Sequence, residues 1–330
     1  MEDSKKSEST KDKNYSDANY SEVDKLLHNT TEIDISSTPL ASQVANELNK
    51  RSLLNKAEHP TPKNTRIIAI TNQKGGVGKT TTVVNIAAAL AKAGKNILTV
   101  DLDPQGNCST ALGINHESTV PSIYESLINS TPISDIIQQC PDINNLDVAP
   151  ATINLSGSEL ELVSMVSREN RLKNAIENYM NYRHEQGLPR YDFILIDCPP
   201  SLGLLTINAF TAADEILIPI QAQYYALEGL SQLLNTINLV KTQLNENQKP
   251  PLMLITMYDA RTNLSNDVVN DVNEHFPDQV LNAIIPQSVR LSEAPSHAQT
   301  IITYEPDSIG ALAYKEAAYE IATWTYQEKI

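Results

Sequence analysis

The chain has 330 residues, of which 41% are hydrophobic and 20% are charged, a composition that is typical of a globular protein and excludes a fibrous or wholly disordered one. Its formal net charge of −15 argues against general affinity for nucleic acid, because DNA binding depends on contacts from Lys and Arg to phosphates; any contact with DNA needs a local basic patch. We expect a cytoplasmic protein with reduced thiols, since no apolar run approaches the ~20 residues that span a bilayer, no secretory signal is visible, and the three cysteines are scattered.

Residues 1–64 differ in character from the rest and are predicted to form an N-terminal extension. The first 34 or so are polar and rich in Ser, Asn, Asp and Lys, which predicts disorder. Thr38 suits an N-cap and Pro39 the first helical position, and apolar residues then recur every fourth position, which predicts one short helix over 38–54. Two interpretations stay open for this helix: it docks on the core or frays, or it recognises another protein.

From residue 65 to 330 we predict a single α/β domain. Nearly continuous apolar runs are typical of strands buried on both faces of a parallel sheet; they span 67–70, 97–100, 193–196, 216–220, 252–255 and 280–285. Helical patterns occur between or after them, over 80–93, 204–212, 227–243, 264–275 and 308–326. The alternation predicts a doubly wound, mostly parallel sheet with helices on both faces, and ligands at the carboxyl ends of the strands. The long segment 113–190 is expected to add two or three helices and a short strand around 146–149.

A glycine-rich loop separates the first apolar run from an alanine-rich helix. Its sequence is Lys74-Gly75-Gly76-Val77-Gly78-Lys79-Thr80-Thr81. Strand, glycine-rich turn and helix N-terminus together are the context of a phosphate-binding loop. The glycines allow backbone N–H groups to surround a polyphosphate. We expect Lys79 to bind the β- and γ-phosphates and the Thr80 hydroxyl to bind Mg²⁺.

Lys74 is a second cation in a loop that needs only one, and it identifies a family resemblance. The loop resembles the "deviant" Walker A motif of the ParA/MinD group of P-loop ATPases. In that group the extra lysine crosses a dimer interface to the partner's nucleotide. Four further segments are similar to motifs of ParA (Soj) partitioning proteins: 100–107, 193–201, 257–262 and 288–296. The resemblance extends from about residue 66 to about residue 323.

Two aspartates complete the predicted catalytic set with Lys74 and Lys79. Asp197 ends an apolar strand, where a Walker B aspartate holds Mg²⁺ through water. The resemblance implies that Asp103 orients or activates the attacking water, and we assign Thr80, Asp103 and Asp197 to the metal site. The alternative for Asp103 is a turn residue at a strand end before Pro104. Asp101 is expected to serve the structure or to support the metal site.

The resemblance also implies sites for adenine and for DNA. Adenine is expected between the Met257-Tyr258 segment and the segment that begins at Pro286, although Tyr258 also suits core packing. DNA contact maps onto Arg261 and Arg290, whose alternative role is to form surface ion pairs. Where many relatives have further cations this chain has Gln287, residues 298–300 and Ile309, so the sequence predicts a thin basic patch.

The implied function is a DNA-partitioning ATPase that uses ATP and Mg²⁺. ATP is expected to drive a homodimer that binds DNA non-specifically, and a ParB-type partner with a basic segment to accelerate slow hydrolysis. The N-terminal extension is a possible site for another protein. One alternative is a MinD-like switch on a membrane surface or a protein scaffold; because residues 319–330 are not basic, no membrane partner is expected. Another is electron transfer or metal-cluster delivery, for which the spacing of Cys108 and Cys198 does not match.

Overall fold

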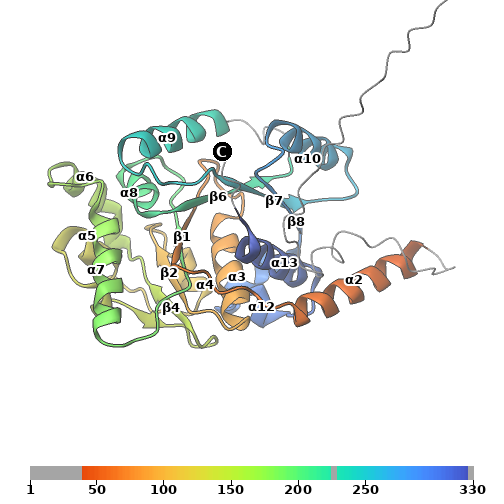
Figure 1. Ribbon diagram of the computed structural model, residues 1–330, viewed down its shortest axis with the longest axis horizontal. Coiled ribbons are helices and arrows are strands. Elements are labelled where there is room, and N and C mark those ends of the chain that lie inside the picture. Colours follow the sequence, from red (N-terminus) through yellow and green to blue (C-terminus); the bar gives the residue numbers. More distant parts are fainter. Residues whose placement is uncertain (1–38, 224–228, 326–330) are drawn as a thin grey trace, which may run out of the picture. The chain divides into compact units, whose positions relative to one another are not determined.

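The computed structural model describes residues 39–223 and 229–325, and the chain divides into two units, Met1–Ala57 and Glu58–Ile330. In the first unit the described part is α2, Pro39–Lys56, which corresponds to the helix expected over 38–54. The prediction of disorder for the first 34 residues lies outside the described residues. The second unit contains the sheet and every motif discussed above (Figure 1).

Within the described residues, eight strands form one sheet in the order β3-β4-β2-β5-β1-β6-β7-β8. All neighbouring strands pair in parallel except β3 and β4. Their bounds are Arg66–Ile70 (β1), Ile97–Asp101 (β2), Gln138–Gln139 (β3), Leu146–Ala149 (β4), Phe193–Asp197 (β5), Glu215–Gln221 (β6), Leu252–Tyr258 (β7) and Val280–Pro286 (β8). Every residue of β2 and β5 is buried, as expected for apolar strands covered on both faces.

Helices cover both faces of this sheet and bury two apolar cores (Figure 1). One core contains residues of α3 (Lys79–Lys92), α4 (Asn107–Ala111), α11 (Val289–Glu293), α12 (Ile301–Tyr304) and α13 (Ile309–Thr323). The other contains residues of α5 (Ile123–Asn129), α6 (Ser158–Val163), α7 (Arg171–Glu185), α8 (Leu204–Ala212), α9 (Leu230–Gln243) and α10 (Asn263–His275). Short 3₁₀ helices are η1 (Ile133–Asp135), η2 (Ile153–Gly157) and η3 (Ala294–His297). The predicted doubly wound α/β fold is therefore confirmed.

The structure departs from the sequence predictions mainly at boundaries and in the long segment 113–190. That segment contains α5, α6 and α7 and the predicted short strand β4, and also the antiparallel strand β3, which was not predicted. The final helix, expected over 308–326, ends at Thr323, because Trp324 leaves helical geometry with φ −59° and ψ 125°. The helix expected over 227–243 is described from Leu230.

Candidate functional site

The glycine-rich loop lies between β1 and the start of α3, at the carboxyl edge of the sheet. Gly76 and Gly78 have φ of 75° and 87°, a left-handed conformation that favours glycine. Gly78 is the N-cap of α3 and gives the helix no side-chain cap, so the first N–H groups of α3 remain available to an anion. A Cβ atom at Gly75 or Gly76 would meet no described atom within 4 Å. The loop therefore has open space over its backbone, as a polyphosphate requires.

Two hydrogen-bonded links attach this loop to strands other than its own. The Thr256 hydroxyl of β7 donates to the Val77 carbonyl at 2.9 Å. The Asn72 amide donates to the Pro219 carbonyl of β6 at 2.8 Å, and its oxygen accepts from the Lys74 backbone N–H at 3.0 Å. The loop is thus held in place before any ligand binds, which lowers the entropic cost of binding.

The two lysines of the loop differ in exposure. Lys79 begins α3 and only 8% of its surface is exposed. Lys74 is partly exposed on the loop. Lys79, buried beside the open space over the loop, is suited to contact an anion bound by its own subunit. The more exposed Lys74 can reach outward from the loop.

Asp197 is a fully buried acid at the end of β5. Burial raises its pKa well above the ordinary value and repulsion from Asp101 adds to this, while the Thr80 hydroxyl and Lys79 oppose the rise. Neither carboxylate oxygen of Asp197 has a hydrogen bond of normal geometry to a described residue. The Thr80 hydroxyl therefore affects the pKa of Asp197 without forming such a bond. A buried carboxylate without such bonds is only partly compensated for the loss of hydration. Together with the nearby hydroxyl it fits Mg²⁺, which takes one or two protein ligands and receives the rest from phosphates and water.

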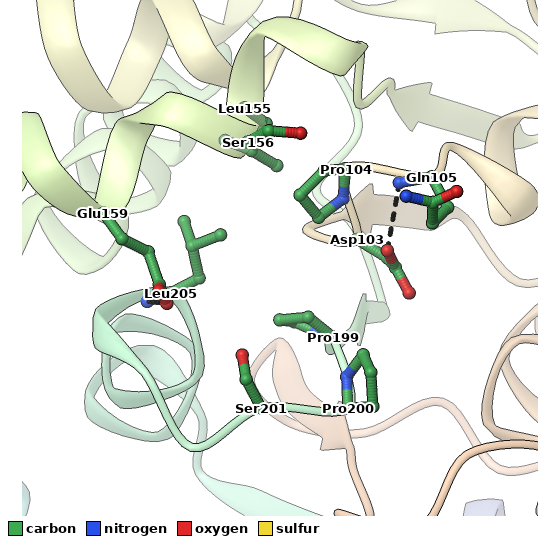
Figure 2. A pocket seen from close by; sticks show the side chains of 10 residues that line it. All are labelled: Asp103, Pro104, Gln105, Leu155, Ser156, Glu159, Pro199, Pro200, Ser201 and Leu205. Carbon is green, nitrogen blue, oxygen red and sulfur yellow. Dashed lines mark hydrogen bonds between the residues drawn. The ribbon is translucent and has the colours of Figure 1, made fainter.

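Asp101 and Asp103 have different surroundings. Asp101 is fully buried, and its carboxylate accepts hydrogen bonds from the Ser109 N–H (3.0 Å), the Ser109 hydroxyl (2.8 Å) and the Asp103 N–H (3.1 Å). Burial raises the pKa of Asp101 to about 6. Asp103 is partly exposed, and its Oδ1 accepts from the Gln105 N–H at 3.0 Å (Figure 2). Asp101 thus ties together the residues that follow β2, while Asp103 forms a turn and is among the residues that line a cavity.

That cavity has a volume of about 270 Å³ and lies between three parts of the second unit (Figure 2). The turn after β2 provides one wall, the η2–α6 segment a second, and the loop after β5 with the start of α8 a third. Its lining residues are Asp103, Pro104, Gln105, Leu155, Ser156, Glu159, Pro199, Pro200, Ser201 and Leu205. Sequence reasoning missed Glu159, because no motif or spacing marks it; only the tertiary fold brings it to this cavity.

The predicted adenine segments lie side by side at the same edge of the sheet. Tyr258 is paired in register with Pro286, and its carbonyl accepts from the Gln287 N–H at 2.9 Å. Met257 has a φ of 53°, which is unusual for a residue other than glycine, and its terminal methyl lies 4.0 Å from the position of a Cβ at Gly78. The Tyr258 hydroxyl donates to Asn266 of α10 at 2.6 Å. Met257 is therefore next to the phosphate loop, whereas the Tyr258 hydroxyl is used in local packing.

The two arginines predicted to bind DNA form ion pairs with nearby acids. Arg261, 88% exposed, contacts Asp259 with two hydrogen bonds of 2.8 and 2.7 Å, and this pairing lowers the pKa of Asp259 to about 2. Arg290 donates to Glu293 at 3.0 Å and lies 3.5 Å from Glu305. The alternative role, surface ion pairing, is thus present in the structure. Ion pairs this exposed contribute little free energy, so each arginine can readily leave its acid partner for another anion.

Comparison with known proteins places this chain in a family. A family model described as an AAA domain matches residues 65–249. The sporulation initiation inhibitor protein Soj of Bacillus subtilis is 53% identical over 257 residues, which cover 78% of this chain and 98% of that protein. The chain belongs to the ParA/Soj family of chromosome-partitioning ATPases. The chromosome partitioning protein ParA of Myxococcus xanthus is 48% identical, with 78% of this chain and 87% of that protein covered. The predicted ParA/MinD resemblance is confirmed.

Solved structures of similar proteins agree with the ParA/Soj assignment of the fold. Cobyrinic acid a,c-diamide synthase from Mycobacterium smegmatis, with bound ADP and magnesium, is 36% identical with a TM-score of 0.66, covering 78% of this chain and 94% of that one. The septum site-determining protein MinD of Pyrococcus horikoshii, complexed with Mg-ADP, has a TM-score of 0.61 at 24% identity, covers 79% of this chain and 97% of that one, and shows the fold alone. Among the described residues, no helix of the ParA/Soj-family chain combines the length and apolar character needed to cross a membrane.

Proposed function

We propose that this chain is a DNA-partitioning ATPase that binds ATP and Mg²⁺ at the glycine-rich loop. The observation that carries the proposal is Asp197, a buried carboxylate that lacks a normal hydrogen bond to any described residue. Thr80 and Lys79 both lower its pKa. Lys79 and the first N–H groups of α3 would hold the β- and γ-phosphates, and Thr80 and Asp197 would hold the metal. Mg²⁺, when bound, neutralises charge on the phosphates. Residues 75–78 and Thr81 would complete the contacts around the phosphates, and Met257, Tyr258 and Pro286 would border the base.

Hydrolysis is assigned to Asp103. Its carboxylate is partly exposed, so it can accept a hydrogen bond from a water molecule. Orientation of the attacking water by a carboxylate is the chemistry that phosphoryl transfer asks of the protein, since most of the barrier is lowered by positioning and charge. The bond from the Gln105 N–H to Oδ1 fixes the side chain.

Dimerisation is assigned to Lys74. Because Lys79 already supplies the buried cation, the more exposed Lys74 can contact the nucleotide of a second copy across a face-to-face interface. The nucleotide would then bridge two subunits, and hydrolysis would release them.

DNA and protein partners are assigned by charge. Two subunits would bring two copies each of Arg261 and Arg290 onto one surface, where phosphates compete with Asp259, Glu293 and Glu305 for the guanidinium groups. The acidic remainder of the chain favours a ParB-type partner with a basic segment. The N-terminal extension, residues 1–64, is the proposed site for a further protein partner.

A DNA mobility-shift assay with ATP, with ADP and without nucleotide tests this function. We expect binding of unrelated DNA sequences with ATP only, and slow Mg²⁺-dependent release of phosphate in parallel. ATP turnover without DNA binding in any state would instead favour a switch that acts on a protein scaffold, an outcome consistent with the ion pairs of both arginines. Absence of ATP binding would overturn the proposal.

A further inference from the structure

Glu159 of α6 contacts the first turn of α8, an element far along the chain. Its Oε1 lies 3.4 Å from the backbone nitrogen of Leu205, which is 46 positions away. Its carboxylate also fills the space over Gly203, since a Cβ atom there would lie only 1.9 Å from Oε1. Gly203, the N-cap of α8, offers no side-chain cap. Glu159 therefore supplies from a distant element the negative group that a helix N-terminus favours.

The first turn of α8 is continuous with the loop that follows Asp197. Within it, the Thr206 hydroxyl donates to the Ser201 carbonyl at 2.6 Å, so the loop at 199–201 is tied to the same turn that Glu159 contacts. Residues of that loop, Asp103 and Glu159 all line the cavity (Figure 2). By fixing the start of α8, Glu159 therefore also fixes the loop at 199–201, which lines the same cavity as Asp103.

We propose that Glu159 is a positioning residue for ATP hydrolysis, because its carboxylate fixes the start of α8 and with it the loop at 199–201, which lines the same cavity as Asp103. The proposal rests on the ATPase function proposed above. Glu159 acts through Gly203 and Leu205 and is not assigned to the nucleotide or the metal. Without it, the first N–H groups of α8 lose an acceptor, and the loop gains freedom at the site where small displacements slow a reaction strongly.

Gly203 offers an independent route to the same effect. Its φ of −83° and ψ of −169° are accessible to any residue, so Gly203→Ala introduces no backbone strain. The closest atoms that the added methyl group would meet belong to the flexible end of Glu159. We therefore expect Gly203→Ala to displace the Glu159 carboxylate and to reproduce the effect of Glu159→Ala.

The test measures kcat and KM for ATP, ATP affinity and thermal unfolding for Glu159→Ala, Gly203→Ala, the double variant and Glu159→Gln. We expect both single variants to lower kcat on the order of 10- to 100-fold with ATP affinity unchanged, and the double variant to be no slower than the worse single one. Glu159→Gln keeps an acceptor oxygen and should recover part of the rate. Glu161→Ala is the matched control, because Glu161 lies on the same helix but accepts from Tyr124 at 3.1 and 3.2 Å.

Amide hydrogen exchange supplies a second measurement that does not depend on turnover. Exchange of the amides in 201–206 should be faster in Glu159→Ala and Gly203→Ala than in wild type or Glu161→Ala. Wild-type kcat in both single variants, or multiplied effects in the double variant, would overturn the proposal. So would a fall in kcat explained by global unfolding, seen as equally faster exchange throughout the chain. A wild-type protein that does not hydrolyse ATP would instead refute the proposed function, and exchange would still report on the contact.

Discussion

Asp101 and Asp197 are register partners at the last residues of β2 and β5, and both are fully buried. Of these two carboxylates, only that of Asp101 accepts hydrogen bonds of normal geometry from described residues. Two acids at equivalent positions on neighbouring strands therefore have different roles. Asp101 anchors the turn that carries Asp103 and the start of α4. The Asp197 carboxylate has no such bond to a described residue, and it is the acid that we propose to hold the metal.

Replacing Asp197 should separate stability from ligand binding. Because burial raises its pKa, the charged form destabilises the folded state at pH values above the raised pKa, and this cost disappears as the pH falls toward the ordinary value of 3.8. Nucleotide-free Asp197→Asn should thus unfold at the same or a higher temperature than wild type near neutral pH, and this difference should shrink in acid. Its Mg·ATP affinity should fall on the order of 10- to 100-fold. A destabilised variant with full Mg·ATP affinity would contradict this prediction.

Lys79→Ala and Lys74→Ala should differ in kind. Charge-assisted hydrogen bonds contribute about 1.5–3 kcal/mol each, so removal of two of them in Lys79→Ala should lower ATP affinity by roughly 100-fold or more. Lys74→Ala should keep ATP binding and lose ATP-dependent dimerisation and turnover. Calorimetry with ATP and sedimentation with and without ATP measure the two properties. Normal dimerisation of Lys74→Ala would refute the role of this lysine across an interface.

Asp103→Ala should bind Mg·ATP but hydrolyse it more slowly, on the order of 10²- to 10⁴-fold, and it should accumulate as an ATP-bound dimer. The reason is that its carboxylate acts on the water, while Thr80 and Asp197 hold the metal. Single-turnover phosphate release and sedimentation measure the outcome. Turnover at the wild-type rate would show that another residue orients the nucleophile and that Asp103 is a turn residue.

Deletion of residues 1–60 should leave ATP binding and turnover close to wild type. The sheet begins at Arg66, and the deletion keeps Thr61, whose hydroxyl accepts from Lys95 at 2.7 Å. Thermal unfolding and ATPase assays of the truncated protein test this expectation, with full-length protein as the control. A large fall in unfolding temperature would show that the extension contributes to the folded core.

DNA affinity should depend on both arginines and on their acid partners. At physiological salt the Debye length is about 8 Å, so a local cluster can act against the net charge of −15. Arg290→Ala should lower ATP-dependent DNA affinity and reduce the slope of log affinity against log salt by about one unit for each phosphate that the arginine neutralises. Asp259→Asn should have the opposite effect on affinity, because it releases Arg261. Equal affinity of wild type and the Arg261→Ala/Arg290→Ala double variant across a salt titration would exclude these contacts.

Much of this architecture follows from sequence because its determinants are local. The apolar runs specify strands buried on both faces, and the loop glycines suit the positive φ found at Gly76 and Gly78. The pairing of Arg261 with Asp259 and of Arg290 with Glu293 is also visible in the spacing, whereas Glu305 reaches Arg290 only in the fold. Strand β3 has two residues, too few for a periodic pattern.

The contact of Glu159 with α8 is the feature that sequence could not supply. No sequence motif links Glu159 to Leu205. The sequence of a helix does not specify which distant carboxylate will lie at its N-terminus. The incompatibility of a Cβ at Gly203 with that carboxylate is likewise a property of two elements packed together. Tertiary packing, rather than local preference, decided these positions.

The hydrogen bond from the Thr256 hydroxyl to the Val77 carbonyl joins β7 directly to the phosphate loop. Met257, whose backbone is in a left-handed conformation, lies near the end of this strand, and Arg261 follows three residues after the strand ends at Tyr258. The phosphate loop and the segment that leads to Arg261 are therefore joined through one strand, β7.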